Sequence, residues 1–187
     1  EVVSYALEQG KTVVTPNKEL IAKKGEELSK IAENSNSELF FEGAVGGGIP
    51  IIHSLKEQLS GDDIEEVIGI VNGTTNFILT EMSLHQTSYA EALKEAQSKG
   101  YAEPVPIMDV EGFDAAYKIA ILASLAFHSI VEVESVYREG ITLLIPEDIE
   151  FAKELGFAVK LLAIAKNLNG ITELRVHPVL LPLDHPL

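Results

Sequence analysis

The sequence has no cysteine and few basic residues, and both shortages narrow its function. Of its 187 residues, 14 are Lys or Arg and 29 are Asp or Glu, which gives a formal net charge of -15 at pH 7. Nucleic acids and anionic membrane surfaces attract positively charged proteins, so neither is an expected partner. Without cysteine there is no disulfide bond, no thiolate nucleophile and no Cys-type zinc site. This fits a reducing compartment, and we expect a cytoplasmic protein.

Several longer patterns are also missing. No apolar run reaches the roughly 18 residues that span a bilayer, and the first residues lack the basic and apolar segments of a secretory signal. The five histidines show no HxxxH or HExxH spacing, so we expect no zinc site. No GxGxxG dinucleotide-binding motif is present. Because the first residue is not Met, we expect the sequence to lie inside a longer protein.

The apolar fraction of 46% is ample for a hydrophobic core, and the most informative apolar stretch is Gly100–Phe127. Its second half has helical apolar spacing and then becomes almost wholly apolar, which predicts a buried helix. Asp114 and Lys118 lie one turn apart on that helix. The preceding loop carries Glu103, Asp109 and two prolines, and we expect it to be stiff and non-helical. Three carboxylates around one ammonium suit a small, positively charged substrate; the alternative is a surface salt bridge.

The uncharged polar run NGTTN, residues 72–76, follows a predicted strand at Ile64–Val71 and precedes a helix expected to start near Phe77. Hydroxyls, amides and free backbone N–H groups at a helix N-terminus bind carboxylates well. A plain capping motif would explain one such residue but not five in a row. This cluster is therefore a second candidate binding region.

The glycine-rich run GAVGGG, residues 43–48, lies between a predicted strand at Leu39–Glu42 and a predicted helix that runs to Leu59. It could bind a phosphate through N–H groups or a cation through carbonyl oxygens. The phosphate alternative fails because the run does not open a glycine-rich helix turn of the GxGxxG type. A cation site and a tight packing turn both remain open.

The remaining patterns predict an α/β fold of the α+β type, with a mixed sheet covered by helices on one side. We expect a helix at residues 1–9, a strand at 11–15, and a helix capped by Asn17. A capping box predicts another helix from Ser88 to Ser98. Two segments, 130–137 and 140–144, are β-rich, and a further helix starts at Pro146. The last pair of strands, 159–166 and 171–176, reads as a hairpin.

Four blocks in order resemble the homoserine dehydrogenase family: VVTPNKELIA (13–22), FEGAVGGGIPII (41–52), IVNGTTNFIL (70–79) and GYAEPVPIMDVEGFDAAYKIAILASLAF (100–127). The resemblance implies NAD(P)-dependent interconversion of L-homoserine and L-aspartate 4-semialdehyde, on the pathway to threonine, methionine and isoleucine. It implies that residues 1–16 are the remnant of a Rossmann nucleotide-binding domain, and that 17–187 form the substrate and dimerisation domain inserted in that frame. A homodimer is implied as well.

The resemblance also assigns roles to residues. The catalytic candidates are Lys118, Lys18 and Asp114, with Asp114 orienting the lysine that exchanges the hydroxyl proton. The substrate-binding candidates are Glu103, Asp109, Gly73, Thr74 and Tyr101. Lys18 and Asn72 are expected at the NAD or NADP cofactor. A structural Na+ is implied at the main-chain oxygens of Glu42, Val45, Gly47 and Ile49.

Three questions stay open at this level. The family usually has an aspartate where this chain has Val105, which removes a loop charge but no assigned site residue. The sequence does not choose between Lys18 and Lys118 as the group that handles the proton. A non-catalytic dimerisation module is the alternative function, whereas an aspartate semialdehyde dehydrogenase is excluded because it needs a nucleophilic cysteine.

Overall fold

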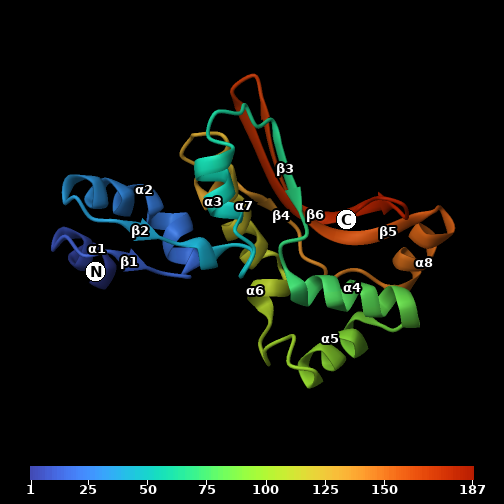
Figure 1. The fold of residues 1–187 in the computed structure, drawn as a ribbon. Coiled ribbons are helices and arrows are strands. Elements are labelled where there is room, and N and C mark those ends of the chain that lie inside the picture. Colours follow the sequence, from blue (N-terminus) through green and yellow to red (C-terminus); the bar gives the residue numbers. More distant parts are fainter.

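Two sheets of different size organise the computed structural model, which describes residues 1–187 (Figure 1). The larger sheet has the strand order β3-β5-β6-β4, in which β5 is antiparallel to β3 and β6 while β4 is parallel to β6. Its strands are β3 (Glu66–Gly69), β4 (Tyr137–Arg138), β5 (Phe157–Leu168) and β6 (Ile171–Pro182). The predicted mixed sheet is therefore confirmed, and the hairpin strands are longer than expected.

The smaller sheet pairs β1 (Val13–Val14) with β2 (Leu39–Phe40) in parallel. It forms the N-terminal unit together with α1 (Val2–Glu8) and α2 (Lys18–Asn34). As predicted, Asn17 caps α2, because its side-chain oxygen accepts the N–H of Leu20 at 3.0 Å. This cap fixes where Lys18 enters the structure.

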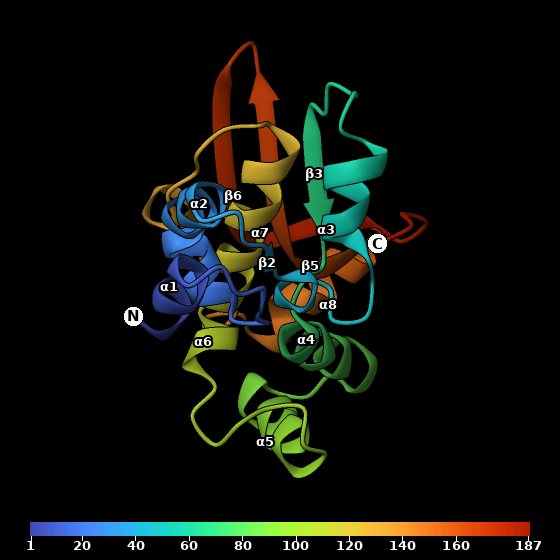
Figure 2. The ribbon, with the colours of Figure 1, turned by 60° about the vertical axis from the view of Figure 1, so that its left-hand side comes forward.

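The other helical elements connect and cover the larger sheet. They are η1 (Glu42–Ala44), α3 (Ile51–His53), the π-helical turn η2 (Ser54–Gln58), α4 (Gly73–His85), α5 (Tyr89–Ser98), α6 (Ile107–Val110), α7 (Phe113–Ala126), η3 (Val133–Ser135) and α8 (Pro146–Glu154). Helices α4, α7 and α8 pack on β5, whereas the tip of the β5–β6 hairpin extends beyond them (Figures 1 and 2). None of the helices combines the length and apolarity that crossing a membrane requires.

The two faces of the sheet pack separately, and the main helices cover one of them, as the period of two along β5 shows. Leu161, Ala163 and Ala165 belong to the main core under the helices. Leu162 and Ile164 point the other way and form a small separate cluster with Leu181 of β6. The predicted coverage of the sheet on one side is therefore confirmed.

Helix α7 is apolar all round because it lies between two cores. Ile119 and Ala123 pack in the main core with the larger sheet. Ile121, Leu122 and Ala126 pack in a second core with the N-terminal unit. The helix thus joins the two parts of the chain, and its first turn lies where they meet.

The prediction that the loop around Glu103 and Asp109 is non-helical was wrong in its second half. Residues Ile107–Val110 form the short helix α6, which includes Asp109. A proline restricts the residue before it and is tolerated at the start of a helix, so Pro106 permits a helical turn immediately after it.

Three other expectations need correction. The strand expected at Leu39–Glu42 ends at Phe40, because the Glu42 carboxylate accepts the N–H groups of Ile52 and His53 and the chain turns into η1. Helix α4 begins at Gly73 rather than near Phe77, so the NGTTN run supplies its cap and first turn. Of the segments called β-rich, 130–137 and 140–144, only Tyr137–Arg138 forms a strand. Val131, Val136 and Ile141 instead enter the main core from loops, whereas Ile130 and Leu143 are exposed.

Candidate active site

Asp114 is the centre of a polar cluster at the first turn of α7, and its side chain is only 8% exposed. Its Oδ1 lies 2.9 Å from the Nζ of Lys18, which begins α2. Its Oδ2 lies 2.7 Å from the Nζ of Lys118, one turn further along α7. The same Oδ2 accepts a hydrogen bond from the side-chain amide of Asn72 at 2.9 Å. One buried carboxylate therefore gathers groups from three separate elements.

These partners determine the charge state of Asp114. Burial alone would raise the pKa of its carboxyl, but the hydrogen bonds from Lys118 and Asn72 and the charge of Lys118 act in the other direction. Lys18 adds a further hydrogen bond, and the pKa falls below its ordinary value of 3.8. Asp114 is thus held as a carboxylate between two lysines.

Asn72 connects Asp114 to the second carboxylate of the loop. Its amide nitrogen also donates to Oδ1 of Asp109 at 2.7 Å. Its amide oxygen accepts the N–H and the hydroxyl of Thr75, which caps the N-terminus of α4. Asn72 is 5% exposed, so a single buried side chain orients both carboxylates and the helix.

The two lysines differ in their surroundings. Lys118 donates to the main-chain oxygen of Val71 at 2.6 Å as well as to Asp114, and its side chain is 18% exposed. The side chain of Lys18 is 40% exposed. Lys118 is therefore anchored inside the fold, whereas Lys18 reaches the same carboxylate from the edge.

A cleft of about 340 Å³ opens beside this cluster. Four of the residues predicted from the sequence line it: Lys18, Glu103, Asp109 and Asp114. Tyr117, Met108, Asn17 and Glu19 line it too, and the sequence reasoning assigned them no role. Tyr117 could have been found, since it follows Asp114 by three positions and so shares its helix face. The cleft therefore presents four carboxylates and the ammonium of Lys18 to a small ligand, and one of these carboxylates, Glu19, is paired with Lys23.

The other predicted substrate residues lie around the start of α4. Thr74 is 9% exposed, and its hydroxyl donates to the main-chain oxygen of Tyr101 at 2.7 Å. The Tyr101 ring lies 4.8 Å from that of Phe77 and is mostly exposed. At Gly73 the space where a side chain would begin is open, with no atom within 4 Å. The structure thus leaves the backbone of Gly73 accessible and uses the Thr74 hydroxyl internally.

The turn expected to hold Na+ lies between η1 and α3, and none of its residues lines this cleft. Gly46 and Gly47 have positive φ angles of 79° and 60°, which bend the chain sharply there. The Glu42 carboxylate is occupied by the N–H groups of Ile52 and His53 at 2.9 and 2.8 Å. Glu42 therefore has its main-chain oxygen, and not its side chain, available for a cation.

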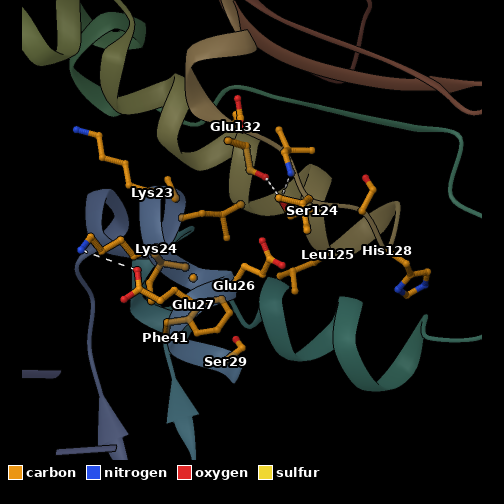
Figure 3. Close-up of a pocket in the computed structure, with 18 of the residues that line it drawn as sticks. Lys23, Lys24, Glu26, Glu27, Ser29, Phe41, Ser124, Leu125, His128 and Glu132 are labelled. Atoms are coloured by element: carbon orange, nitrogen blue, oxygen red, sulfur yellow. Dashed lines mark hydrogen bonds and ion pairs between the residues drawn. The ribbon is translucent and has the colours of Figure 1, made fainter. Parts of the chain in front are cut away.

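A larger cavity of about 1030 Å³ lies between α2 and the C-terminal half of α7 (Figure 3). Phe41 and Leu125 are among its apolar lining residues, and its rim carries charges of both signs, with Lys24 paired to Glu27 at 3.9 Å. None of the site residues predicted from the sequence lines it. The smaller cleft at Asp114 is therefore the candidate active site.

The chain is similar to known proteins over most or all of its length. A family model described as "Homoserine dehydrogenase" matches residues 50–187. The homoserine dehydrogenase of Corynebacterium glutamicum is 52% identical over 192 aligned residues, covering 100% of this chain and 43% of that protein. That of Bacillus subtilis is 50% identical, covering 97% of this chain and 42% of that protein. The chain thus spans about two fifths of the length of these curated relatives.

Solved structures give the same result. A homoserine dehydrogenase from Thiobacillus denitrificans superimposes with a TM-score of 0.96 at 47% identity, covering 99% of this chain and 43% of that one. A hyperthermophilic archaeal homoserine dehydrogenase in complex with NADPH gives a TM-score of 0.84 at 35% identity, covering 99% of this chain and 53% of that one.

Proposed function

Because the chain belongs to the homoserine dehydrogenase family, we propose that it forms the substrate-binding part of an enzyme that interconverts L-homoserine and L-aspartate 4-semialdehyde. One observation carries the proposal: Asp114, buried and held by Lys18 and Lys118, borders a cleft that Glu103 and Asp109 also line. Such a cleft matches an amino-acid substrate with an alcohol at its other end.

The two charged groups of the substrate find different partners. We assign the substrate ammonium to Glu103 and Asp109, because both carboxylates line the cleft. We assign its carboxylate to the N-terminus of α4, where Gly73 leaves the backbone accessible and the helix dipole favours an anion. Thr74 contributes backbone atoms to this site, and Tyr101 lies next to it.

The reaction requires one proton to leave the hydroxyl group. Lys118 is our candidate for that exchange, since Asp114 and the Val71 carbonyl fix its ammonium in the less exposed part of the cluster. Lys18 is the rival, because it lines the cleft. Asp114 orients either lysine and stays ionised between them.

NAD or NADP supplies the hydride acceptor when bound. Lys18 and Asn72 are our candidates for its nicotinamide end, and the open space at Gly73 and the exposure of Lys18 suit a flat ring there. The archaeal relative in complex with NADPH supports this choice of cofactor class. The pathway to threonine, methionine and isoleucine, and the cytoplasmic location, belong to the same proposal.

We also propose a structural Na+ at the main-chain oxygens of Glu42, Val45, Gly47 and Ile49. The left-handed glycines at 46 and 47 fold these carbonyls into one short turn. Carbonyl oxygens are hard ligands of the kind that such cations prefer. The residues present therefore fit a structural ion, outside the catalytic cleft.

A homodimer is part of the proposal, and it also gives the alternative function, a non-catalytic dimerisation module. The second face of the larger sheet favours both, because Ile68 of β3 is 42% exposed there and pairs with Ile164 of the small buried cluster. The two functions differ in whether Asp114 and its lysines are needed for turnover.

The deciding experiment measures L-homoserine-dependent reduction of NAD and NADP by the complete protein and by its Lys118→Ala variant. We expect the parent to be active and the variant to lose kcat by roughly 1,000-fold. Lys153→Ala, which removes an exposed lysine from α8, is the matched control and should keep full activity. An inactive parent would refute the enzymatic proposal and leave the dimerisation module.

A further inference from the structure

Residues Arg138–Thr142, here named the strap, join the edge of the larger sheet to residues 109–114, here named the corner, which connect α6 to α7. On the sheet side, β4 pairs with β6, and the N–H of Glu139 donates to the carbonyl of Val176 at 2.8 Å. None of the strap residues lines the cleft.

On the other side the strap is bonded to the corner at successive residues. The N–H of Ile141 donates to the carbonyl of Val110 at 2.8 Å. The hydroxyl of Thr142 donates to Oε1 of Glu111 at 2.9 Å. A main-chain bond and a side-chain bond thus fix two consecutive residues of the corner.

Gly140 allows the two segments to approach this closely. A Cβ at position 140 would lie 2.5 Å from the carbonyl oxygen of Val110 and 2.8 Å from the Cα of Glu111. Both atoms belong to the backbone and cannot rotate away. Any side chain at position 140 must therefore push the corner and the strap apart.

The strap also contacts Gly112 and Phe113, which follow Glu111 in the corner. The guanidinium of Arg138 lies 3.6 Å from the ring centroid of Phe113. Gly112 caps α7 with a φ of 77°, and a Cβ there would lie 3.1 Å from both Arg138 and Val176. The strap therefore holds the middle of the corner, from Val110 to Phe113, between the two carboxylates Asp109 and Asp114.

The corner carries two of the four carboxylates of the cleft, Asp109 and Asp114. Both meet the same amide nitrogen of Asn72, at 2.7 and 2.9 Å. Such short bonds leave little room for displacement of either carboxylate. We propose that the strap is a positioning element of the active site, in which Gly140 and Thr142 set the relative placement of Asp109 and Asp114. This proposal rests on the proposed function.

The first test compares Gly140→Ala with Gly61→Ala in the complete protein. Gly61 is the matched control, because it is exposed and a Cβ there would meet no atom within 4 Å. We expect Gly140→Ala to lower kcat/KM for L-homoserine by roughly 100-fold, the cost of a small misplacement of catalytic groups. Gly61→Ala should behave as the parent.

The second test removes the side-chain bond without adding volume to the backbone contact. Thr142→Val should raise the KM for L-homoserine and lower kcat/KM by roughly tenfold, the value of one hydrogen bond to a charged group. Thr142→Ser restores the hydroxyl and should recover most of the loss. A merely structural role would change stability without this rescue of KM. If Gly140→Ala does not fold, this pair decides the proposal alone.

A third readout does not depend on turnover. Amide hydrogen exchange across residues 107–118 should be faster in Gly140→Ala and in Thr142→Val than in the parent and in Gly61→Ala. Unchanged exchange there together with unchanged kcat/KM would overturn the strap proposal. An inactive parent whose exchange still responds to these variants would refute the enzymatic function and keep the structural role of the strap.

Discussion

The N-terminal unit and the larger part of the chain, which contains the larger sheet and α7, each provide a lysine that pairs with Asp114. The two lysines differ in exposure and in the number of their partners. The larger part supplies Lys118, whose ammonium has two acceptors, at 2.6 and 2.7 Å, and whose side chain is 18% exposed. The N-terminal unit supplies Lys18, whose side chain is 40% exposed and which meets Asp114 at 2.9 Å. Strands β1 and β2 have two residues each, whereas β5 and β6 have twelve.

Because of this difference, Lys118 and Lys18 have different structural roles although their side chains are chemically identical. Lys118 is tied to Val71 and to its own helix, so it fixes the orientation of Asp114 whether or not the N-terminal unit moves. Lys18 joins the two parts across the cleft and is screened by water. The first ion pair is therefore anchored within the fold, whereas the second lies at its partly exposed edge.

Asp114→Asn should have the largest effect, because it removes the charge that both lysines share. We expect kcat/KM to fall roughly 1,000-fold and the free energy of unfolding to fall by about 2–4 kcal/mol, since two ammonium groups lose their buried counter-charge. Steady-state kinetics and urea unfolding of the parent and the variant measure both changes. Asp62→Asn, at an exposed turn, is the control that should change neither.

The pH dependence of that stability difference has a definite sign. The pKa of Asp114 is lowered in the folded state, so its contribution is fully present above the ordinary value of 3.8 and is lost as the pH falls through the lower folded value. The gap between parent and Asp114→Asn should therefore be constant at neutral pH and close in acid. A gap that widened on acidification would contradict the assignment of Asp114 as a carboxylate.

Contacts within one helix could be predicted from the sequence, and contacts between the two parts could not. The buried helix α7, the Asp114–Lys118 pair and the Asn17 cap all follow from local spacing. The contact of Lys18 with Asp114 depends on how α2 packs on α7, to which no local pattern points. The same holds for the bond from Lys118 to Val71.

The wrong strand predictions around the strap have a related cause. The segments 130–137 and 140–144 are rich in β-branched residues, but Val131, Val136 and Ile141 enter the main core from loops, and the backbone pairs with β6 only at Tyr137–Arg138. Strand propensity measures a fit to a half-buried surface, which a loop packed on the core also offers. Their position beside the corner could be seen only in the fold.

Replacing Lys118 should lower the free energy of unfolding more than replacing Lys18. Lys118→Met should lower the free energy of unfolding by about 2 kcal/mol, because the Val71 carbonyl and Asp114 both lose a charged donor. Lys18→Met should cost no more than about 1 kcal/mol, since its partly exposed pair is screened by solvent. Urea unfolding at low and high salt measures both, and only the Lys18 effect should shrink with salt. Equal losses of unfolding free energy in the two variants would show that Lys18 and Lys118 stabilise Asp114 equally.

Lys160 on β5 extends the comparison to a lysine with neutral partners, and its effect should be the smallest. Its ammonium donates to the Asn76 side chain at 2.8 Å and lies 3.4 Å from the Thr80 hydroxyl, and burial lowers its pKa from the ordinary value of 10.5. The unfolded chain therefore binds more protons at this residue between the two pKa values, so its contribution to stability rises with pH there. Urea unfolding from neutral to alkaline pH should show that the free energy of unfolding of the parent rises relative to that of Lys160→Met. Relative to the exposed-site control Lys153→Met, it should stay constant. A gap that stayed flat with pH would contradict the lowered pKa of Lys160.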